Sequence, residues 1–474
     1  MTVESITADR RIDLRAGVVV FLLLCLVPPI ILFLAGKEIP ALIILPLPVL
    51  LLLVAWPRAT FYVYLLSVSF YLPYYIGTFA VWPFDVAMAL LTFAVLVESL
   101  LLTRLCFERT PFDLPFWFLI AATWLSALFA HNTSLSVVPS LRILMIYVAF
   151  RVTYVLAKQI GVRKVVLFYI YQIFALAILN VILFVAHGGK VRVYGPAWLA
   201  FENYSMTALP MALAFLLWAR TSGERLRFAL AIITILVAVA GSGSRGSLVA
   251  IAIAVPTLLI LAMVKMRREG SFGAGRAIRK VLVVAAVAAF VLLLGGALFG
   301  DLAARLGQLV ASVSHPQGTV ALRIVLWTVA FKAFLTSPLV GIGIGNFHLV
   351  DQVVPAIKTN PVWYYVKGMS AHNVLLHYMA ETGLFGALSL VALAATGLKI
   401  GNRFFKSRME QRDTQVSAAL FITMFVFCAT ILFMRAWTWA QEGHILAILF
   451  GLVAAWNYEC TRGKATQLSD SISR

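Results

Sequence analysis

A histidine and an asparagine, His372-Asn373, stand where a long polar segment gives way to an apolar stretch. Nine residues separate Asn373 from Gly383, and Gly386 follows closely. We expect His372 to lie at a membrane surface, within reach of water and of a lipid-borne substrate. Histidine can take up a proton near neutral pH, so His372 is a candidate general base. A histidine at the start of a helix can also simply cap or anchor it.

Three arginines are expected on the same side of the membrane as His372. Arg192 lies in a predicted outer loop, Arg245 begins an apolar stretch among small residues, and Arg323 begins a predicted helix. Arginine in or beside a membrane is costly unless it is paired or hydrated, which makes it a functional candidate. Its planar donor fork suits phosphate oxygens. The alternatives are interface anchoring for Arg192 and a solvated helix face for Arg323.

The helix that carries Arg323 is predicted over residues 321–336, where apolar and polar positions alternate with helical spacing. Such a helix would lie along the membrane or cover a cavity. A proline and three glycines follow within residues 337–347 and should end it. Backbone amides of a glycine-rich turn can approach an anion closely, which makes Gly343 and Gly345 candidate substrate-binding residues. A plain turn would need the same glycines.

Carboxylates are scarce on the predicted outer side. The candidates are Asp85, Glu202, Asp301, Asp351, Glu381 and Glu442. No two of them have metal-binding spacing, so neither a metal nor another cofactor is predicted. Glu381 is expected to pair with a cation within the helix bundle, Arg435 being one candidate. His377 is expected to pack or to support its neighbours.

These residues need a membrane scaffold to position them. The chain has 474 residues, of which 62% are hydrophobic and 12% charged, and its mean hydropathy is +0.97. Repeated apolar runs indicate an all-α polytopic integral membrane protein with 12–14 spans. The predicted spans are 17–36, 40–55, 60–78, 83–103, 113–130, 137–157, 165–186, 203–219, 228–242, 246–264, 281–299, 373–398, 416–434 and 442–457.

The distribution of basic residues predicts the orientation. The net charge is +19, but the Lys and Arg residues cluster in short loops that alternate with uncharged ones, so no nucleic-acid partner is implied. By the positive-inside rule both termini are cytoplasmic. The expected organisation is eleven transmembrane helices over 1–299, a long, partly helical periplasmic loop over 300–371, three more helices over 372–458 and a cytoplasmic tail over 459–474.

Four motifs occur in order over about residues 190–390. They are Ser244-Arg245-Gly246, Arg323-x3-Trp327, Pro338-Leu339-Val340-Gly341-Ile342-Gly343-Ile344-Gly345-Asn346-Phe347 and His372-Asn373-x9-Gly383-x2-Gly386. This ordered set resembles the O-antigen ligase and O-antigen polymerase superfamily of bacterial envelope glycosyltransferases. Members of that superfamily resemble integral-membrane glycosyltransferases of the C type. Arg192 also resembles the family's upstream arginine motif, although Phe201-Glu202-Asn203 stands where a Pro-Asn is common. The first 180 residues match only as apolar spans.

The resemblance implies an undecaprenyl-pyrophosphate-linked glycan as donor, presented at the periplasmic face of a bacterial inner membrane, with membrane lipids around it. It implies an O-antigen ligase that transfers the glycan to a sugar hydroxyl of lipid A–core by a metal-independent, inverting displacement. Arg245 and Arg323 would bind the pyrophosphate, and His372 would orient or deprotonate the acceptor. The implied substrate-binding residues are Arg192, Asn373, Gly343 and Gly345.

Two alternatives stay open. A polymerase of O-antigen or exopolysaccharide repeats would use the same donor with another glycan as acceptor, and the motifs do not encode the acceptor. A transporter of lipid-linked glycan would usually place charges at the membrane midplane and contain inverted repeats. Here the cations gather at the predicted outer interface and no repeat is evident, which disfavours a transporter.

Overall fold

Helices make up most of the described protein. The computed structural model describes residues 50, 53–70, 74–76, 79–101, 108–186, 198–242, 319–359, 363, 367–407, 411–430 and 441–472, with short stretches between 253 and 264. The chain divides into two compact units, residues 1–68 with 73–108 and residues 69–72 with 109–474.

In the first unit, helices α5 (Pro57–Val68) and α6 (Pro83–Leu101) pack together. Between them in sequence, β1 (Tyr74–Ile76) and β2 (Phe79–Val81) pair antiparallel, with Tyr74 opposite Val81. The prediction of a span over 60–78 is therefore wrong, because the helix ends at Val68 and a hairpin begins at Tyr74. Aromatic and β-branched residues favour strands, and the pairing of Ile76 with Phe79 is the register of a tight hairpin.

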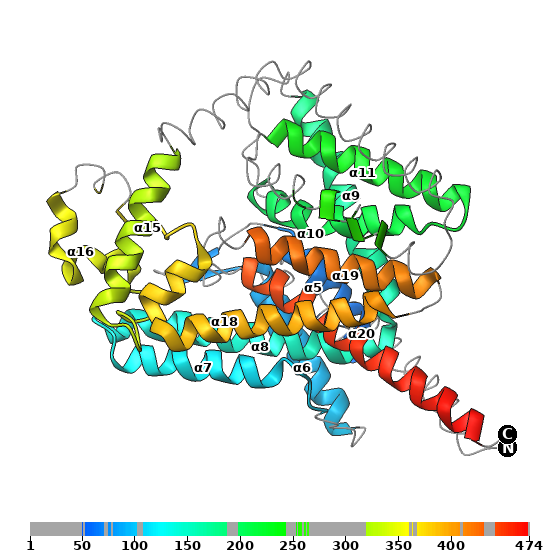
Figure 1. Ribbon diagram of the computed structural model, residues 1–474, viewed down its shortest axis with the longest axis horizontal. Helices are drawn as coiled ribbons and strands as arrows, with labels where there is room; N and C mark the ends of the chain where they lie inside the picture. Colours follow the sequence, from blue (N-terminus) through cyan, green and yellow to red (C-terminus); the bar gives the residue numbers. More distant parts are fainter. Residues whose placement is uncertain are drawn as a thin grey trace, which may run out of the picture. The chain divides into compact units, whose positions relative to one another are not determined.

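The second unit contains the remaining elements (Figure 1). They are α7 (Asp113–Leu128), α8 (Thr133–Ile160), α9 (Val162–Ala186), α10 (Trp198–Leu217), α11 (Ser222–Ser242), α15 (Thr319–Thr336), η1 (Phe347–Leu349), α16 (Val350–Val353), η2 (Pro355–Thr359), α18 (Val374–Lys406), α19 (Gln411–Thr430) and α20 (Gln441–Ile472). Helix α7 lies beside both α8 and α18, α8 packs along α20, and α10 packs along α19.

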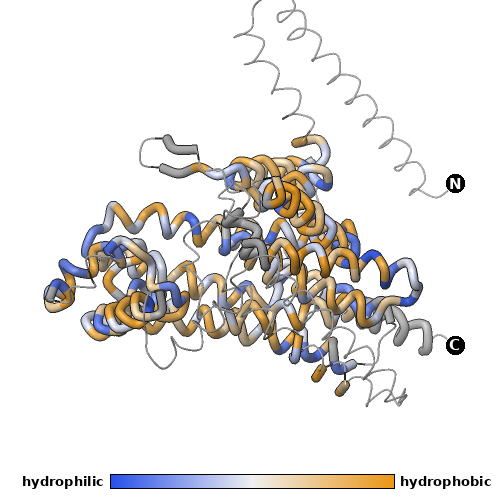
Figure 2. Tube along the Cα trace, turned by 90° about the horizontal axis from the view of Figure 1, so that it is seen from above, coloured by the Kyte–Doolittle hydropathy of each residue, from blue (hydrophilic) through white to orange (hydrophobic). Residues whose placement is uncertain are grey.

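Six helices of the described residues are long and apolar enough to cross a membrane. Their apolar stretches are Pro83–Leu100, Thr133–Ile160, Val162–Leu183, Val374–Phe404, Asp413–Thr430 and Glu442–Arg462. Hydrophobic residues predominate along the helices (Figure 2). The prediction of a helical, polytopic membrane protein is therefore confirmed. Several of the 12–14 predicted spans, such as 17–36 and 281–299, lie outside the described residues.

An ion pair fastens α7 to α8 at the ends away from their connecting turn. Arg151 of α8 lies 3.0 Å from the Asp113 carboxylate at the start of α7, and the Tyr147 hydroxyl donates to the same carboxylate at 3.1 Å. Both charged side chains are largely buried. Paired charges of this kind are the form in which ionisable groups are tolerated within a helix bundle in a membrane.

Candidate functional site

His372 lies directly before α18 in an uncommon backbone conformation. Its φ is +49°, and among the described residues it is the only one other than glycine with a positive φ. A non-glycine residue in this region costs on the order of 1–3 kcal/mol and persists only where its surroundings enforce it. Such strain is often found at functional sites.

Asn373 fixes where the helix after His372 begins. Its backbone is extended, and its side-chain Oδ1 accepts a hydrogen bond from the Leu376 N–H at 3.0 Å, which is the geometry of an N-cap. The Asn373 side chain is buried and committed to this cap through Oδ1. Its predicted role in substrate binding stays a prediction.

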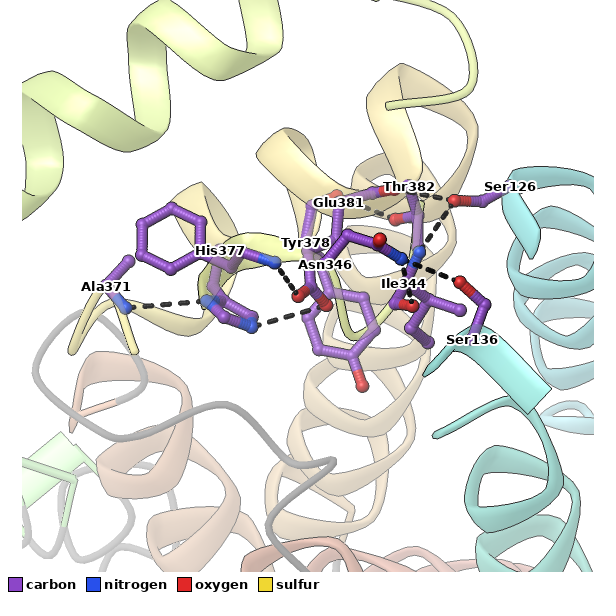
Figure 3. Close-up of polar contacts among 10 residues, drawn as sticks. Ser126, Ser136, Ile344, Asn346, Ala371, His377, Tyr378, Glu381 and Thr382 are labelled. Carbon is purple, nitrogen blue, oxygen red and sulfur yellow. Dashed lines mark hydrogen bonds and ion pairs between the residues drawn. The ribbon is translucent and has the colours of Figure 1, made fainter. Parts of the chain in front are cut away.

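Two buried ionisable residues follow within α18 (Figure 3). His377 Nε2 lies 3.3 Å from Glu381 Oε2, and His377 Nδ1 accepts a hydrogen bond from the Ala371 N–H at 3.4 Å. The other oxygen, Glu381 Oε1, accepts from the Phe347 N–H at 3.0 Å. Glu381 was expected to pair with a cation such as Arg435, which lies outside the described residues. Among the described residues its partner is His377, and the i,i+4 spacing of the two residues was the overlooked signal, while a pairing with Arg435 stays a prediction.

The glycine-rich segment 337–347 lies against a kink in α18 at Gly383 (φ +66°, ψ −159°). At the kink the helical bonding is exchanged for bonds to this segment. The Leu384 N–H donates to the Pro338 carbonyl at 2.8 Å, while the Ala380 carbonyl accepts from the Ile342 N–H at 2.9 Å. The Glu381 carbonyl accepts from the Gly343 N–H at 3.1 Å. The segment thus supplies the partners that a straight helix would have supplied.

The glycines allow this close approach. An added Cβ at Gly341 (φ +72°) would lie 2.2 Å from the Glu381 carbonyl carbon, and one at Gly383 would lie 2.3 Å from that of Leu339. An added Cβ at Gly343 (φ +105°) would lie 2.3 Å from Ala130 Cβ in the α7–α8 turn. One at Gly345 (φ +79°) would lie 2.7 Å from Pro139 Cγ in α8. These glycines therefore have a structural role. Substrate binding by Gly343 and Gly345 stays a prediction.

Asn346 joins the same segment to the turn between α7 and α8. Its Oδ1 accepts from the Asn132 N–H at 2.9 Å, and its Nδ2 donates to Ser136 Oγ at 2.8 Å. Ser126 Oγ donates to the Glu381 carbonyl at 2.6 Å and accepts from the Ile344 N–H at 3.0 Å (Figure 3). We call residues 337–347, the α7–α8 turn and the α18 kink the outer joint, after the side of the membrane on which the sequence predicts residues 300–371. Sequence reasoning did not identify the serines and asparagines that hold it together.

Helix α15, which carries Arg323, packs against α18. It confirms the helix predicted over 321–336, and it ends at Thr336, just before the proline and glycines. The shared core consists of Leu326, Val329, Ala330, Ala333, Ile342, Phe347, Val350, Ile357, Trp363, Ala371 and Ala380. Ala371 adjoins His372, and Leu326 lies one turn from Arg323. The segments that carry these two candidates therefore pack into the same hydrophobic core.

The predicted site residues differ in whether the structure describes them. Arg192 and Arg245 lie outside the described residues. Arg323 and His372 are both half-buried and both make contacts with other groups. Within the described part of the chain, no group of three or more His, Cys, Asp or Glu residues is arranged to hold a metal ion.

Comparison with known proteins identifies one matching segment. Residues 229–391 match the family model for O-antigen ligase, which is about a third of the chain. The match includes Arg245, α15, residues 337–347 and the beginning of α18 with His372. It confirms the resemblance to the O-antigen ligase and polymerase superfamily. No curated protein sequence matches the chain significantly.

Proposed function

We propose that this chain, with its O-antigen ligase family segment over residues 229–391, is an O-antigen ligase that acts on lipid-linked glycans at the outer face of the bacterial inner membrane. Its donor would be a glycan on undecaprenyl pyrophosphate, and its acceptor a sugar hydroxyl of lipid A–core. The observation that carries the proposal is the strained His372, held within the matched segment beside the helix that carries Arg323.

The proposed reaction is a single displacement. The acceptor hydroxyl oxygen attacks the anomeric carbon of the glycan, and the bond from that carbon to the pyrophosphate oxygen breaks. The hydroxyl proton passes to His372 or to water that His372 orients. Attack from the face opposite the leaving group inverts the anomeric configuration. The lipid pyrophosphate leaves with the electron pair.

Arginine supplies the electrostatic part of this proposal. Negative charge grows on the pyrophosphate as the glycosidic bond breaks, and a positioned guanidinium stabilises that charge more than it stabilises the bound donor. We assign this role to Arg323 and Arg245, and we assign the distal phosphate or the glycan to Arg192. Support for Arg245 and Arg192 comes from their sequence motifs, since both lie outside the described residues.

The experiment is transfer by the purified protein in liposomes. The donor is an undecaprenyl-pyrophosphate-linked glycan, and the acceptor is either lipid A–core or a second lipid-linked repeat. We expect one glycan to be joined to lipid A–core, with release of undecaprenyl pyrophosphate. If only the lipid-linked glycan were elongated, the protein would be a polymerase and not a ligase. Movement of donor between leaflets without a new glycosidic bond would contradict both.

A further inference from the structure

The hydrogen bonds of His377 define its tautomer. The Ala371 N–H can only donate, so His377 Nδ1, which receives it at 3.4 Å, carries a lone pair and no proton. The proton of a neutral imidazole then lies on Nε2, which faces Glu381 Oε2 at 3.3 Å and can donate to it. His377 therefore makes a contact through each of its ring nitrogens. It is 3% exposed, so water cannot readily replace either bond.

These two bonds connect the backbone before His372 to the outer joint. On one side, Ala371 is the residue directly before His372 and is fully buried. On the other side, Glu381 reaches the Phe347 N–H with its second oxygen, and the Phe347 ring packs over His377 with ring centroids 4.9 Å apart. The connection runs from Ala371 through His377 and Glu381 to the end of the glycine-rich segment.

His372 therefore lies between two fixed points. The Asn373 cap holds the residue after it, and the bond from the Ala371 N–H to His377 holds the residue before it. A left-handed residue relaxes to a common conformation unless both flanking peptides are held. The bond to His377 restrains the peptide before His372, which the capping bond does not reach.

We propose that His377 and Glu381 form a positioning pair for His372, with His377 holding the strained backbone through Ala371 and Glu381 anchoring His377 to the outer joint. The inference rests on the proposed function, because it assigns His372 the acceptor side of the transfer. Neither member of the pair touches substrate. Their effect is on the place and direction of the His372 ring.

Two substitutions of His377 separate the two bonds. Asparagine can place an oxygen near the position of Nδ1, so His377→Asn keeps an acceptor for the Ala371 N–H and loses the donor to Glu381. Glutamine reaches the position of Nε2, so His377→Gln keeps the donor to Glu381 and loses the acceptor for Ala371. Comparison of the two variants therefore distinguishes the positioning of His372 from the anchoring of the fold.

We expect opposite orders of stability and activity. His377→Gln should melt closer to the wild type, since Glu381 keeps its donor, yet its kcat for glycan transfer should fall roughly 10- to 100-fold because the His372 ring is misplaced. Its KM for the lipid-linked donor should be unchanged. His377→Asn should melt lower because a buried carboxylate oxygen loses its partner, but it should keep the higher kcat of the two.

A second measurement needs no activity. Diethyl pyrocarbonate modifies accessible histidines, and mass spectrometry gives the rate at His372 relative to the exposed His131 and His348 in the same sample. We expect this ratio to change several-fold in His377→Gln and much less in His377→Asn. If the wild type transfers no glycan to any acceptor, the proposed function fails while this ratio still tests the positioning pair.

Three experimental outcomes would contradict the positioning role of His377 and Glu381. If kcat follows thermal stability, with His377→Gln as the more active variant, or if the two variants have equal kcat, the pair is structural only. An equal modification ratio at His372 in both variants would overturn it in the same way.

Discussion

The two ends of the α7–α8 helix pair are fastened by different chemistry. At the ends away from the connecting turn, Asp113 and Arg151 form a largely buried ion pair at 3.0 Å. At the turn, most bonds of the outer joint come from serine and asparagine side chains and from backbone groups, among them Asn346, Ser126 and the carbonyl of Glu381. One end uses opposite charges to hold helices together, and the other uses shape and hydrogen bonds.

The two ends differ in whether their arginines are available to bind a phosphate. An arginine whose charge is neutralised by a carboxylate, as Arg151 is by Asp113, is a poor ligand for a phosphate. The bonds of the outer joint named above come from serine, asparagine, histidine, glutamate and the backbone. Its one buried carboxylate, Glu381, is bonded to His377 and to the Phe347 N–H. This arrangement suits a face whose arginines are proposed to bind pyrophosphate.

Within this comparison the largest effect is expected for Arg323 of helix α15. Arg323→Ala should lower the transfer rate about 10³-fold, equivalent to ~4 kcal/mol of transition-state stabilisation, because it removes a cation from the leaving pyrophosphate. Lys332→Ala is the matched control, since Lys332 is an exposed cation on the same helix. Initial rates of glycan release in liposomes measure both. Wild-type rates in folded Arg323→Ala would remove Arg323 from the mechanism.

The opposite end should respond in stability and leave chemistry unchanged. Arg151→Met leaves the Asp113 carboxylate buried without its cation, which costs on the order of 3 kcal/mol of the free energy of unfolding. Adding Asp113→Asn should restore most of the loss, since no charge is then unpaired. Thermal unfolding in detergent measures the change. If the folded fraction of Arg151→Met also lost its transfer rate, the separation between the two ends would be wrong.

A glycine pair tests the close approach in the outer joint. Gly341→Ala places a Cβ 2.2 Å from the Glu381 carbonyl carbon, whereas Gly368→Ala (φ +85°) meets nothing within 4 Å. Both substitutions carry the left-handed cost of roughly 1–2 kcal/mol, and only Gly341→Ala adds a clash worth about 1–3 kcal/mol more. We therefore expect a clearly lower melting temperature for Gly341→Ala. Equal melting temperatures would show that the outer joint accommodates the added Cβ of Gly341→Ala without a loss of stability.

The smallest effect concerns an ion pair outside the membrane-spanning helices. Burial would raise the pKa of Asp351, but Lys367, 2.9 Å away, together with Lys358 and a backbone hydrogen bond, outweighs burial and holds that pKa below its ordinary value. Because the folded-state pKa is depressed, the pair stabilises the fold above the unfolded pKa of about 3.9. That contribution is lost as the pH falls through the folded-state pKa. Lys367 is more than half exposed, so we expect less than about 1 kcal/mol.

Melting curves between pH 6 and pH 3, roughly the range over which aspartate titrates, measure this effect. The wild type should lose slightly more stability with acid than Asp351→Asn does. Identical acid dependence in the two proteins would mean that the Asp351–Lys367 pair does not stabilise the outer region.

The sequence predicted those features that depend on local pattern. Hydrophobic periodicity placed the helix over 321–336, and the proline with its glycines placed its end. Asn373 could be recognised as a helix start from the polar-to-apolar change. The hairpin at 74–81 was missed because a short aromatic and β-branched run reads equally well as part of a span.

The outer joint could not be predicted because its bonds connect distant residues. Ser126 and Ile344 are 218 positions apart, and Asn132 and Asn346 are 214 apart. No local pattern encodes such pairs. The positive φ of His372 was also hidden, since it follows from bonds on both sides of the residue. The glycines were visible in the sequence, but only the structure shows which backbone atoms they approach.

The most direct test is a single-turnover transfer by His372→Ala, compared with wild type at matched folded protein and saturating donor. We predict that the rate of new glycosidic bond formation falls about 10²- to 10⁴-fold, while binding of the lipid-pyrophosphate donor is unchanged. A wild-type rate in a folded His372→Ala protein would contradict the assignment of His372 to the acceptor side of the transfer.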